Sequence, residues 1–262
     1  MTKSLQSSVA MNNGVHIPIF GLGTWDMYKK TLEQAIEWAL AIGYRHFDTA
    51  TYYHNEQELG TTLKNSGLAR NEYFITTKVY PADFGYEKTK NALKTSLEKL
   101  QTEFVDQYLI HWPKDKQSTN ESWKALVEMY QQQLCRSIGV SNYSIKQLED
   151  LKGISDIIPA TNQIELHPFV YKQDILDYCK SEGIIMVSYS PLVEGKRLKD
   201  PRLQPIAAKY NKTPAQILLR WGLEQDTVVI PKSSNKNRLQ ENISIFDFKL
   251  TPEDMQILNS FN

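Results

Sequence analysis

The sequence has little cysteine and no excess of charge, and each shortage excludes a class of protein. Only Cys135 and Cys179 occur among the 262 residues, too few for a disulfide framework or a zinc site. Lys plus Arg equal Asp plus Glu at 30 each, so no net field would attract nucleic acid or an anionic membrane. No apolar run approaches the roughly 20 residues of a membrane helix. We therefore expect a cytoplasmic globular protein with reduced cysteines and no metal site.

The chain also lacks the G-x-G-x-x-G turn with which an open, doubly wound sheet usually binds a pyrophosphate. Its first β-rich run holds only Gly21 and Gly23, with no third glycine opening a helix. Eight such runs alternate with helical patterns, at 17–25, 44–50, 73–79, 104–112, 136–142, 159–166, 184–192 and 227–233. This alternation predicts a single (β/α)₈ TIM barrel over residues 17–262. Residues 1–16 form a lead-in, and their "NNG" is typical of a hairpin turn.

Several predicted helices have readable starts. Thr31, Ser144 and Thr213 are each followed three residues later by Gln, the spacing of a capping box. Thr251 precedes a Pro, which favours a helix that begins there. We predict helices with these four residues as N-caps.

Polar and aromatic residues gather where the predicted strands end. In a barrel of this kind the active site lies at the carboxyl ends of the strands. The residues there are Asp48, Lys78, His111, Trp112, Ser141, Asn142, Gln163, Tyr189, Ser190, Lys232 and Ser233. Each alone has an ordinary explanation, such as a helix cap for Asp48, a surface position for Lys78 or a core position for His111. That an acid, a lysine, a histidine and a tyrosine meet at one mouth by chance is improbable.

The same set predicts acid–base chemistry. Tyrosine has a reference pKa near 10 and is a poor acid at neutral pH. A neighbouring ammonium lowers that pKa, and a carboxylate keeps a buried ammonium charged. Our hypothesis is that Asp48 supports Lys78 and that Lys78 tunes Tyr53, while a neutral His111 orients a substrate carbonyl.

A basic loop follows the eighth predicted strand. The sequence "PKSSNKNR" places Lys232, Ser233, Lys236 and Arg238 together, and (β/α)₈ barrels often bind phosphate after this strand. Arginine pairs bidentately with phosphate, and hydroxyls and helix N-termini complete such sites. A second basic stretch, at 195–199, is a further candidate for a cofactor's pyrophosphate.

These residues stand in segments that resemble those of the aldo-keto reductases. "FGLGTW", "DTATYYHNE", "TTKV", "LIHWP", "IGVSNY", "NQIELHP", "SYSPL" and "IPKSSNKNRLQEN" follow that family's order over nearly the whole chain. The similarity is to its short members, such as the 2,5-diketogluconate reductases and the prostaglandin F synthases. It implies an NADPH-dependent reductase of aldehydes, ketones and dicarbonyls, with the cofactor cycling between NADPH and NADP+.

The resemblance also implies roles for individual residues. The catalytic set would be Tyr53 as proton donor with Asp48, Lys78 and His111. The implied cofactor contacts are Thr24, Trp25, Ser141, Asn142, Gln163, Tyr189, Ser190, Leu192, Lys232, Ser233, Arg238 and Asn242. Among these, Ser141, Asn142 and Gln163 would hold the carboxamide and Tyr189 would stack on the ring. The implied substrate contacts are Trp25, Tyr52, His111 and Trp112.

Two departures from the family pattern bear on specificity. Val193 stands where the family often has glycine, and the chain ends just after its last predicted helix. Without the long tail that closes the pocket in some members, we expect a shallow, open pocket, broad specificity and a monomer. Two other functions stay open: a Schiff-base aldolase with Lys78 as nucleophile, and a non-enzymatic NADP(H)-binding protein.

Overall fold

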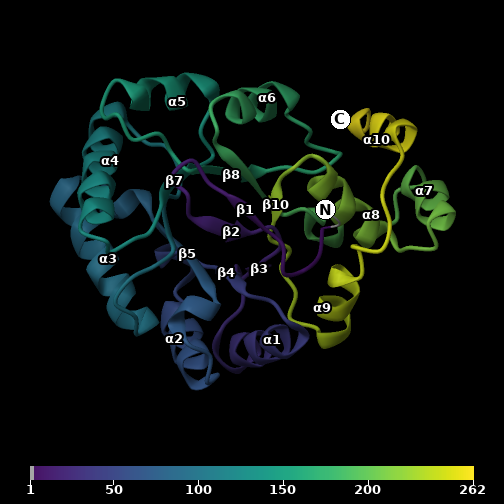
Figure 1. The fold of residues 1–262 in the computed structure, drawn as a ribbon, viewed down its shortest axis with the longest axis horizontal. Coiled ribbons are helices and arrows are strands. Elements are labelled where there is room, and N and C mark those ends of the chain that lie inside the picture. Colours follow the sequence, from purple (N-terminus) through teal and green to yellow (C-terminus); the bar gives the residue numbers. More distant parts are fainter. Residues whose placement is uncertain (1–2) are drawn as a thin grey trace.

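Parallel strands form a closed barrel in the computed structural model, which describes residues 3–262 (Figure 1). Within this range the barrel strands are β3 (Leu22–Gly23), β4 (His46–Asp48), β5 (Phe74–Val79), β6 (Gln107–Ile110), β7 (Ile138–Ser141), β8 (Thr161–Glu165), β9 (Ile185–Tyr189) and β10 (Val228–Val229). They pair in chain order, all in parallel. A parallel bridge from Phe20 to Val229 closes the ring, with the Gly21 amide donating to the Val229 carbonyl at 2.9 Å. The predicted (β/α)₈ barrel is confirmed.

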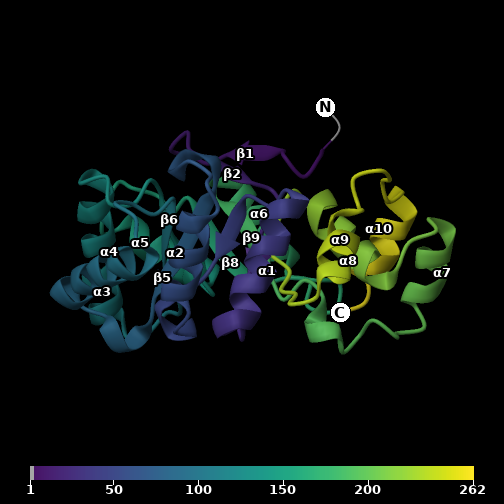
Figure 2. The ribbon, with the colours of Figure 1, turned by 90° about the horizontal axis from the view of Figure 1, so that it is seen from below.

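Helices surround the barrel as an outer layer (Figures 1 and 2). They are α1 (Lys29–Ile42), α2 (Glu56–Asn65), α3 (Tyr86–Leu100), α4 (Lys116–Gln131), α5 (Ile145–Lys152), α6 (Gln173–Ser181), α7 (Leu203–Lys209), α8 (Pro214–Glu224), α9 (Lys236–Ile243) and α10 (Pro252–Asn259). Their apolar faces pack on the strands in one large core that includes Phe20, Phe47 and Trp221. Over residues 3–262, every helix is too short or too polar to span a bilayer.

A short hairpin covers the amino-terminal end of the barrel (Figure 2). Its strands β1 (Ser8–Ala10) and β2 (His16–Pro18) pair in an antiparallel register, and Gly14 adopts a positive φ of 81° in the turn. Met11 and Ile17 pack with Phe74 and other residues at the strand starts. The strand predicted over 17–25 is therefore divided between this hairpin and the barrel.

The predicted helix starts are correct at three positions and wrong at one. The side chains of Ser144, Thr213 and Thr251 accept bonds from backbone amides in the first turn of α5, α8 and α10. Thr31 is not an N-cap, because α1 begins at Lys29 after Tyr28 and the hydroxyl of residue 31 lies inside the first turn. Spacing alone did not locate this helix start, which has Tyr28 as N-cap and no side-chain cap bond.

For the substitution Gly60→Ala, helix propensity and packing predict opposite changes in the free energy of unfolding. In a helix interior, Gly→Ala usually stabilises by up to about 1 kcal/mol. Here a Cβ would lie 2.5 Å from the backbone of Leu100, which cannot move independently of α3. We expect Gly60→Ala to lower the free energy of unfolding by about 2 kcal/mol or more, measured by urea denaturation.

Gly153→Ala is the matched control for this substitution. Gly153 has an ordinary negative φ, and its added Cβ would meet only the Asp150 carbonyl, at 3.5 Å. Its free energy of unfolding should change by less than about 1 kcal/mol. A Gly60→Ala protein as stable as the control would show that α2 and α3 are not packed this closely.

Candidate active site

A cavity of about 1060 Å³ opens at the carboxyl ends of the barrel strands. The cavity forms here because parallel pairing brings the carboxyl ends of all eight strands to one rim. Its wall holds nearly all of the residues predicted from the sequence, namely Trp25, Asp48, Tyr52, Tyr53, His111, Trp112, Ser141, Asn142, Gln163, Tyr189, Ser190, Leu192, Lys232, Ser233, Arg238 and Asn242. Lys78 lies behind this wall and is fully buried.

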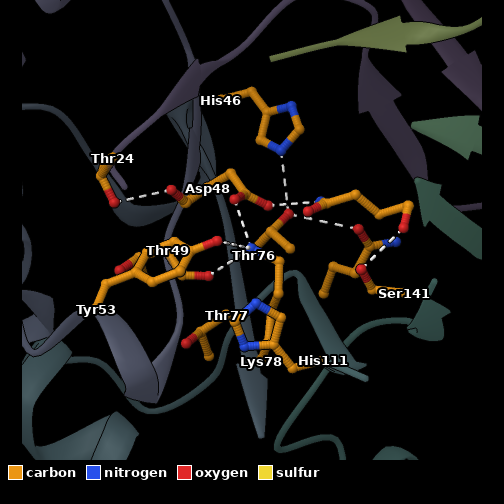
Figure 3. Close-up of polar contacts among 12 residues, drawn as sticks. Thr24, His46, Asp48, Thr49, Tyr53, Thr76, Thr77, Lys78, His111 and Ser141 are labelled. Atoms are coloured by element: carbon orange, nitrogen blue, oxygen red, sulfur yellow. Dashed lines mark hydrogen bonds and ion pairs between the residues drawn. The ribbon is translucent and has the colours of Figure 1, made fainter. Parts of the chain in front are cut away.

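Lys78 links the predicted acid to the predicted phenol (Figure 3). Its Nζ donates to Asp48 Oδ1 at 2.5 Å, to the Thr49 carbonyl at 2.9 Å and to Tyr53 Oη at 3.3 Å. An ammonium has three N–H donors, so these three acceptors use all of them. Tyr53 comes from the 3₁₀ turn Thr51–Tyr53 after β4, which turns its ring back over the end of β5.

The protonation of this group differs from the simplest expectation. The pKa of Tyr53 is raised from its ordinary value, because burial disfavours the phenolate more than Lys78 favours it. Burial also acts to lower the pKa of Lys78, but Asp48 and Tyr53 outweigh it, so the pKa is raised and the side chain is an ammonium. Lys78 therefore acts in the predicted direction on Tyr53, but the net lowering of the Tyr53 pKa that the sequence suggested is wrong.

His111 is a neutral imidazole next to the phenol. Burial, and secondly the charge of Lys78, lower its pKa to about 3. Its ring lies edge-to-face with Tyr53, with centroids 5.5 Å apart. The buried Nδ1 has no hydrogen-bond partner in the described part of the chain. A neutral ring beside a protonated phenol is suited to orient a carbonyl oxygen without placing a second positive charge in the site.

A network of hydrogen bonds joins polar side chains at the carboxyl ends of β7, β8 and β9. Asn142 donates from Nδ2 to Ser141 Oγ at 2.9 Å and to the His111 carbonyl at 3.1 Å. Its Oδ1 accepts from Tyr189 Oη at 2.9 Å. Ser141 Oγ donates to the Gln163 carbonyl at 2.8 Å. The ends of β7, β8 and β9 are thus tied together around groups able to hold a planar amide.

The basic loop after β10 is well suited to bind an anion. Lys232 and Arg238 both line the cavity, and neither forms an ion pair with any of residues 3–262. Asn235 caps α9 by accepting from the Arg238 amide at 3.1 Å. Asn242 lines the same region, and its buried Nδ2 has no partner among the described residues. Two unpaired cations and an orphaned donor fit a phosphorylated adenosine group.

The side chains of two sequence-based candidates are bonded to other residues of the chain. Thr24 is fully buried and is absent from the cavity wall, and its hydroxyl donates to the Asp48 carbonyl at 2.9 Å. Its side chain supports β4, and its contact with a cofactor stays a prediction. In the second basic stretch, Lys196 pairs with Glu194, and Arg197 pairs with Asp200 at 2.7 Å. Gly195 and Leu198 of this stretch line the cavity, whereas these two cations are paired with acids.

The loop after β9 has an unusual backbone. Ser190, Val193 and Glu194 all have positive φ values, of 48°, 53° and 52°. A left-handed conformation is costly for a β-branched residue, which explains why glycine suits position 193 in this family. Leu192 and Glu194 of this loop line the cavity. This part of the cavity wall is therefore held in a strained conformation.

Sequence reasoning missed two supporting residues. Asn55 is fully buried, and its Nδ2 donates to the carbonyls of Thr24 and Met27, which fixes the loop that carries Trp25. Tyr80 stacks on Tyr52 with centroids 4.2 Å apart. The signals were present, since an asparagine follows the tyrosine pair and an aromatic residue lies two positions after Lys78. Neither signal is specific without the fold.

The mouth of the cavity is aromatic and open. Tyr52 lies between Tyr80 and Trp25, whose ring stacks on it at 5.6 Å with an interplanar angle of 8°. Trp25, Tyr52 and Trp112 are still 46%, 42% and 45% exposed, which is high for rings of this size. The rim thus offers apolar ring faces to a substrate without enclosing it.

A barrel with an Asp–Lys–Tyr–His cluster at its cavity and a basic loop after its last strand is the arrangement expected of a nicotinamide-dependent carbonyl reductase. The sequence model of the Aldo/keto reductase family matches residues 19–262. The chain therefore belongs to the aldo/keto reductase family of carbonyl-reducing oxidoreductases.

Three relatives show the extent of this similarity. A glyoxal reductase of Bacillus subtilis is 44% identical over 263 residues, covering 100% of this chain and 95% of the relative. A 9,11-endoperoxide prostaglandin H2 reductase of Trypanosoma cruzi is 42% identical, covering 97% of this chain and 91% of the relative. A Bombyx mori aldo-keto reductase, whose crystal structure is in complex with NADP, is 36% identical in sequence and superposes with a TM-score of 0.93. The match covers 99% of this chain and 94% of the relative.

The buried histidines predict how stability depends on pH. Burial lowers the pKa of His46 and of His111 to about 3, below the ordinary value of 6.5. Between these values the unfolded chain binds more protons, so the free energy of unfolding falls as the pH falls from 6.5. Each histidine contributes up to about 1.4 kcal/mol per pH unit to this loss.

We expect His46→Gln and His111→Gln each to flatten the dependence of stability on pH between 6.5 and 4.5, measured by urea denaturation. The double variant should be flatter than either. The slope is the diagnostic quantity, because a change in packing shifts the whole curve. Variants whose curves stay parallel to that of the unmodified chain would show that these imidazoles can accept protons in the folded state.

Proposed function

We propose that this chain reduces aldehydes, ketones and dicarbonyls to alcohols with NADPH, using Tyr53 as the proton donor. The observation that carries the proposal is the contact of the Lys78 ammonium with both Asp48 and Tyr53 Oη beneath the floor of the cavity. The Tyr53 hydroxyl faces a cavity large enough for a dinucleotide and a small carbonyl compound. Membership of the family supports the same reaction class.

The polar groups of the cavity suit NADP(H). Ser141, Asn142 and Gln163 would hold the carboxamide, and the Tyr189 ring would support the nicotinamide. Lys232, Ser233 and Arg238 would bind the 2′-phosphate, next to Asn242 with its unpartnered amide. The remaining implied contacts on the wall are Trp25, Ser190 and Leu192. When bound, the cofactor supplies the hydride that reduces the carbonyl carbon.

The chain's own residues account for the proton. Because burial raises the pKa of Tyr53, the hydroxyl keeps its proton at neutral pH until a carbonyl oxygen develops negative charge beside it. Lys78 then stabilises the phenolate that remains, and Asp48 keeps that ammonium charged. Neutral His111 orients the oxygen against Tyr53, while Trp25, Tyr52 and Trp112 contact the rest of the substrate.

The open rim favours broad specificity. The exposed rings contribute apolar contact area without a closed wall, so carbonyl compounds of different sizes can enter. Glyoxal reduction in a relative supports including dicarbonyls in the substrate class. Two buried free cysteines support a reducing, cytosolic setting.

The geometry around Lys78 and Tyr53 favours the reductase over the two alternative functions, a Schiff-base aldolase and a non-enzymatic cofactor-binding protein. A Schiff-base aldolase needs a neutral, accessible amine. Lys78 is fully buried, its three protons are engaged, and its pKa is raised. A non-enzymatic cofactor-binding protein would have no need of an assembled proton donor, and here all four members of the cluster meet.

Replacing the Tyr53 hydroxyl should abolish most of the chemistry. We expect Tyr53→Phe to lower kcat for aldehyde reduction by about 10²- to 10⁴-fold, because the proton donor is lost. The Kd for NADPH, measured by fluorescence titration, should change little, since the ring stays in place. The assay is NADPH consumption with methylglyoxal, phenylglyoxal and nitrobenzaldehyde.

Tyr80→Phe is the matched control for this measurement. The Tyr80 ring stacks on Tyr52, and its hydroxyl has no hydrogen bond to any described residue. This variant should keep nearly the full rate. If Tyr53→Phe also retained most of its rate, the assignment of the proton donor would be wrong.

Arg238 tests the choice between NADPH and NADH. Hydrogen bonds to a charged group contribute about 1.5 to 3 kcal/mol, so Arg238→Ala should weaken NADPH binding by about 10- to 100-fold. NADH lacks the 2′-phosphate, and its Kd should barely change. Lys236→Ala removes one positive charge from the same loop at a position away from the cavity wall, and should have a smaller effect. Equal losses for both cofactors with Arg238→Ala would refute the role.

A further inference from the structure

Gln163 contacts the catalytic cluster as well as the cavity. The residue lies on β8, and its side chain lines the cavity while being almost fully buried. Its Nε2 donates to Asp48 Oδ2 at 2.8 Å. The other carboxylate oxygen of Asp48 accepts from Lys78 at 2.5 Å. Gln163 is thus hydrogen-bonded to the carboxylate that keeps Lys78 charged.

Chemistry fixes the orientation of this amide. A carboxylate paired with an ammonium has no proton to donate, so only the NH₂ end of the glutamine can face Asp48. The Oε1 atom and the second N–H of Nε2 are then the polar groups of the side chain left for a ligand. Within residues 3–262 no donor is hydrogen-bonded to Oε1. Gln163 can therefore offer an incoming cofactor a free acceptor at Oε1 while one N–H of its Nε2 stays bonded to Asp48.

The hydrogen bonds form one continuous chain. It leads from Gln163 to Asp48. From Asp48 it continues through Lys78 and ends at Tyr53 Oη (Figure 3). Every N–H of Lys78 is used, so the ammonium cannot turn away from the phenol without breaking one of these bonds. A change in how strongly Gln163 holds Asp48 is transmitted along this chain to the proton donor.

We propose that Gln163 is a positioning residue that couples cofactor binding to the proton donor, its Oε1 accepting from the carboxamide NH₂ while its Nε2 holds Asp48. This inference rests on the proposed function, since it takes NADP(H) as the ligand of the cavity. Accepting a hydrogen bond at Oε1 polarises the amide and strengthens donation from Nε2. Asp48 then shares more of its charge with Gln163, and the Lys78 ammonium is less neutralised where it faces Tyr53.

The coupling has a defined sign. Asp48 raises the pKa of Tyr53 and Lys78 lowers it. Drawing charge from Asp48 toward Gln163 therefore eases proton release from Tyr53 in the cofactor-bound protein. Removing the amide reverses this effect and makes the phenolate harder to form. A side chain that only filled space at this position would change packing and rate but would not move this ionisation.

Cofactor analogues test the acceptor role through binding alone. The acetylpyridine analogue of NADP+ replaces the carboxamide NH₂ by CH₃, whereas the thionicotinamide analogue keeps the NH₂. We expect the unmodified chain to bind the acetylpyridine analogue about tenfold more weakly than NADP+, and the thionicotinamide analogue within about threefold of NADP+. Kd values come from calorimetry, so activity is not needed.

Gln163→Met should abolish the discrimination, with NADP+ and the acetylpyridine analogue binding equally. Gln107→Met is the matched control, because Gln107 is equally buried in the barrel but bonds to Thr76 and Met11 and is absent from the cavity wall. This control should keep the tenfold preference. A Gln163→Met protein that retains the preference would overturn the inference. So would an unmodified chain that has no preference, a result that stands even if the variant fails to fold.

The pH dependence of alcohol oxidation with NADP+ tests the coupling itself. This direction requires the Tyr53 phenolate as base, so the rate rises with pH around the ionisation of Tyr53. Gln163→Met should move the midpoint to higher pH by about half a pH unit, and Gln107→Met should leave it in place. A lower rate with an unmoved midpoint would reduce Gln163 to a packing role and overturn the coupling.

The two proposals fail in different ways. If the unmodified chain neither binds NADP+ nor reduces any carbonyl compound, the proposed function fails and this inference fails with it. If the unmodified chain is an active NADPH-dependent reductase that binds both analogues equally, only the role of Gln163 is overturned.

Discussion

The site depends on one buried positive charge. An isolated ammonium in a protein interior is very costly, so Lys78 requires a carboxylate and a full set of acceptors. The parallel register of β4 and β5 supplies them, because it sets Asp48 opposite Thr76 and so places Lys78 two residues further along the same rim. Thr49 and Tyr53 follow directly in the chain. The register of β4 and β5 therefore determines the electrostatics of the cluster as well as its geometry.

Much of the fold and of the cavity wall could be predicted because barrel strands have a simple pattern. Apolar runs end in polar residues where they reach the rim, so Asp48, His111 and Gln163 stood out before the structure. Capping boxes at Ser144 and Thr213 were predictable because their hydrogen bonds are local. The start of α1 was not, since the helix begins after Tyr28 without a side-chain cap and the capping-box spacing at Thr31 is not used.

Quantities that depend on burial could not be predicted. The sequence predicted a cation beside Tyr53. It could not predict how strongly burial opposes the effect of that cation, and burial decides the sign of the change in the Tyr53 pKa. The same holds for the two basic stretches, whose compositions are similar. Arg197 is paired with an acid three residues away, whereas Arg238 faces the cavity unpaired. Only the positions of the neighbouring acids separate a structural cation from one available to an anion.

The opposed effects on Tyr53 suit a proton donor better than a simple lowering of its pKa would. A phenol that ionised readily would lose its proton to water before a carbonyl arrived. Burial by the barrel rim keeps the hydroxyl protonated, and the Lys78 ammonium limits the free-energy cost of the phenolate once the proton has moved. Both conditions arise from one arrangement, in which the half-buried Tyr53 ring lies at the rim with the Lys78 ammonium on its inner side. A surface tyrosine beside a lysine would lack the first condition, and a buried tyrosine without Lys78 would lack the second.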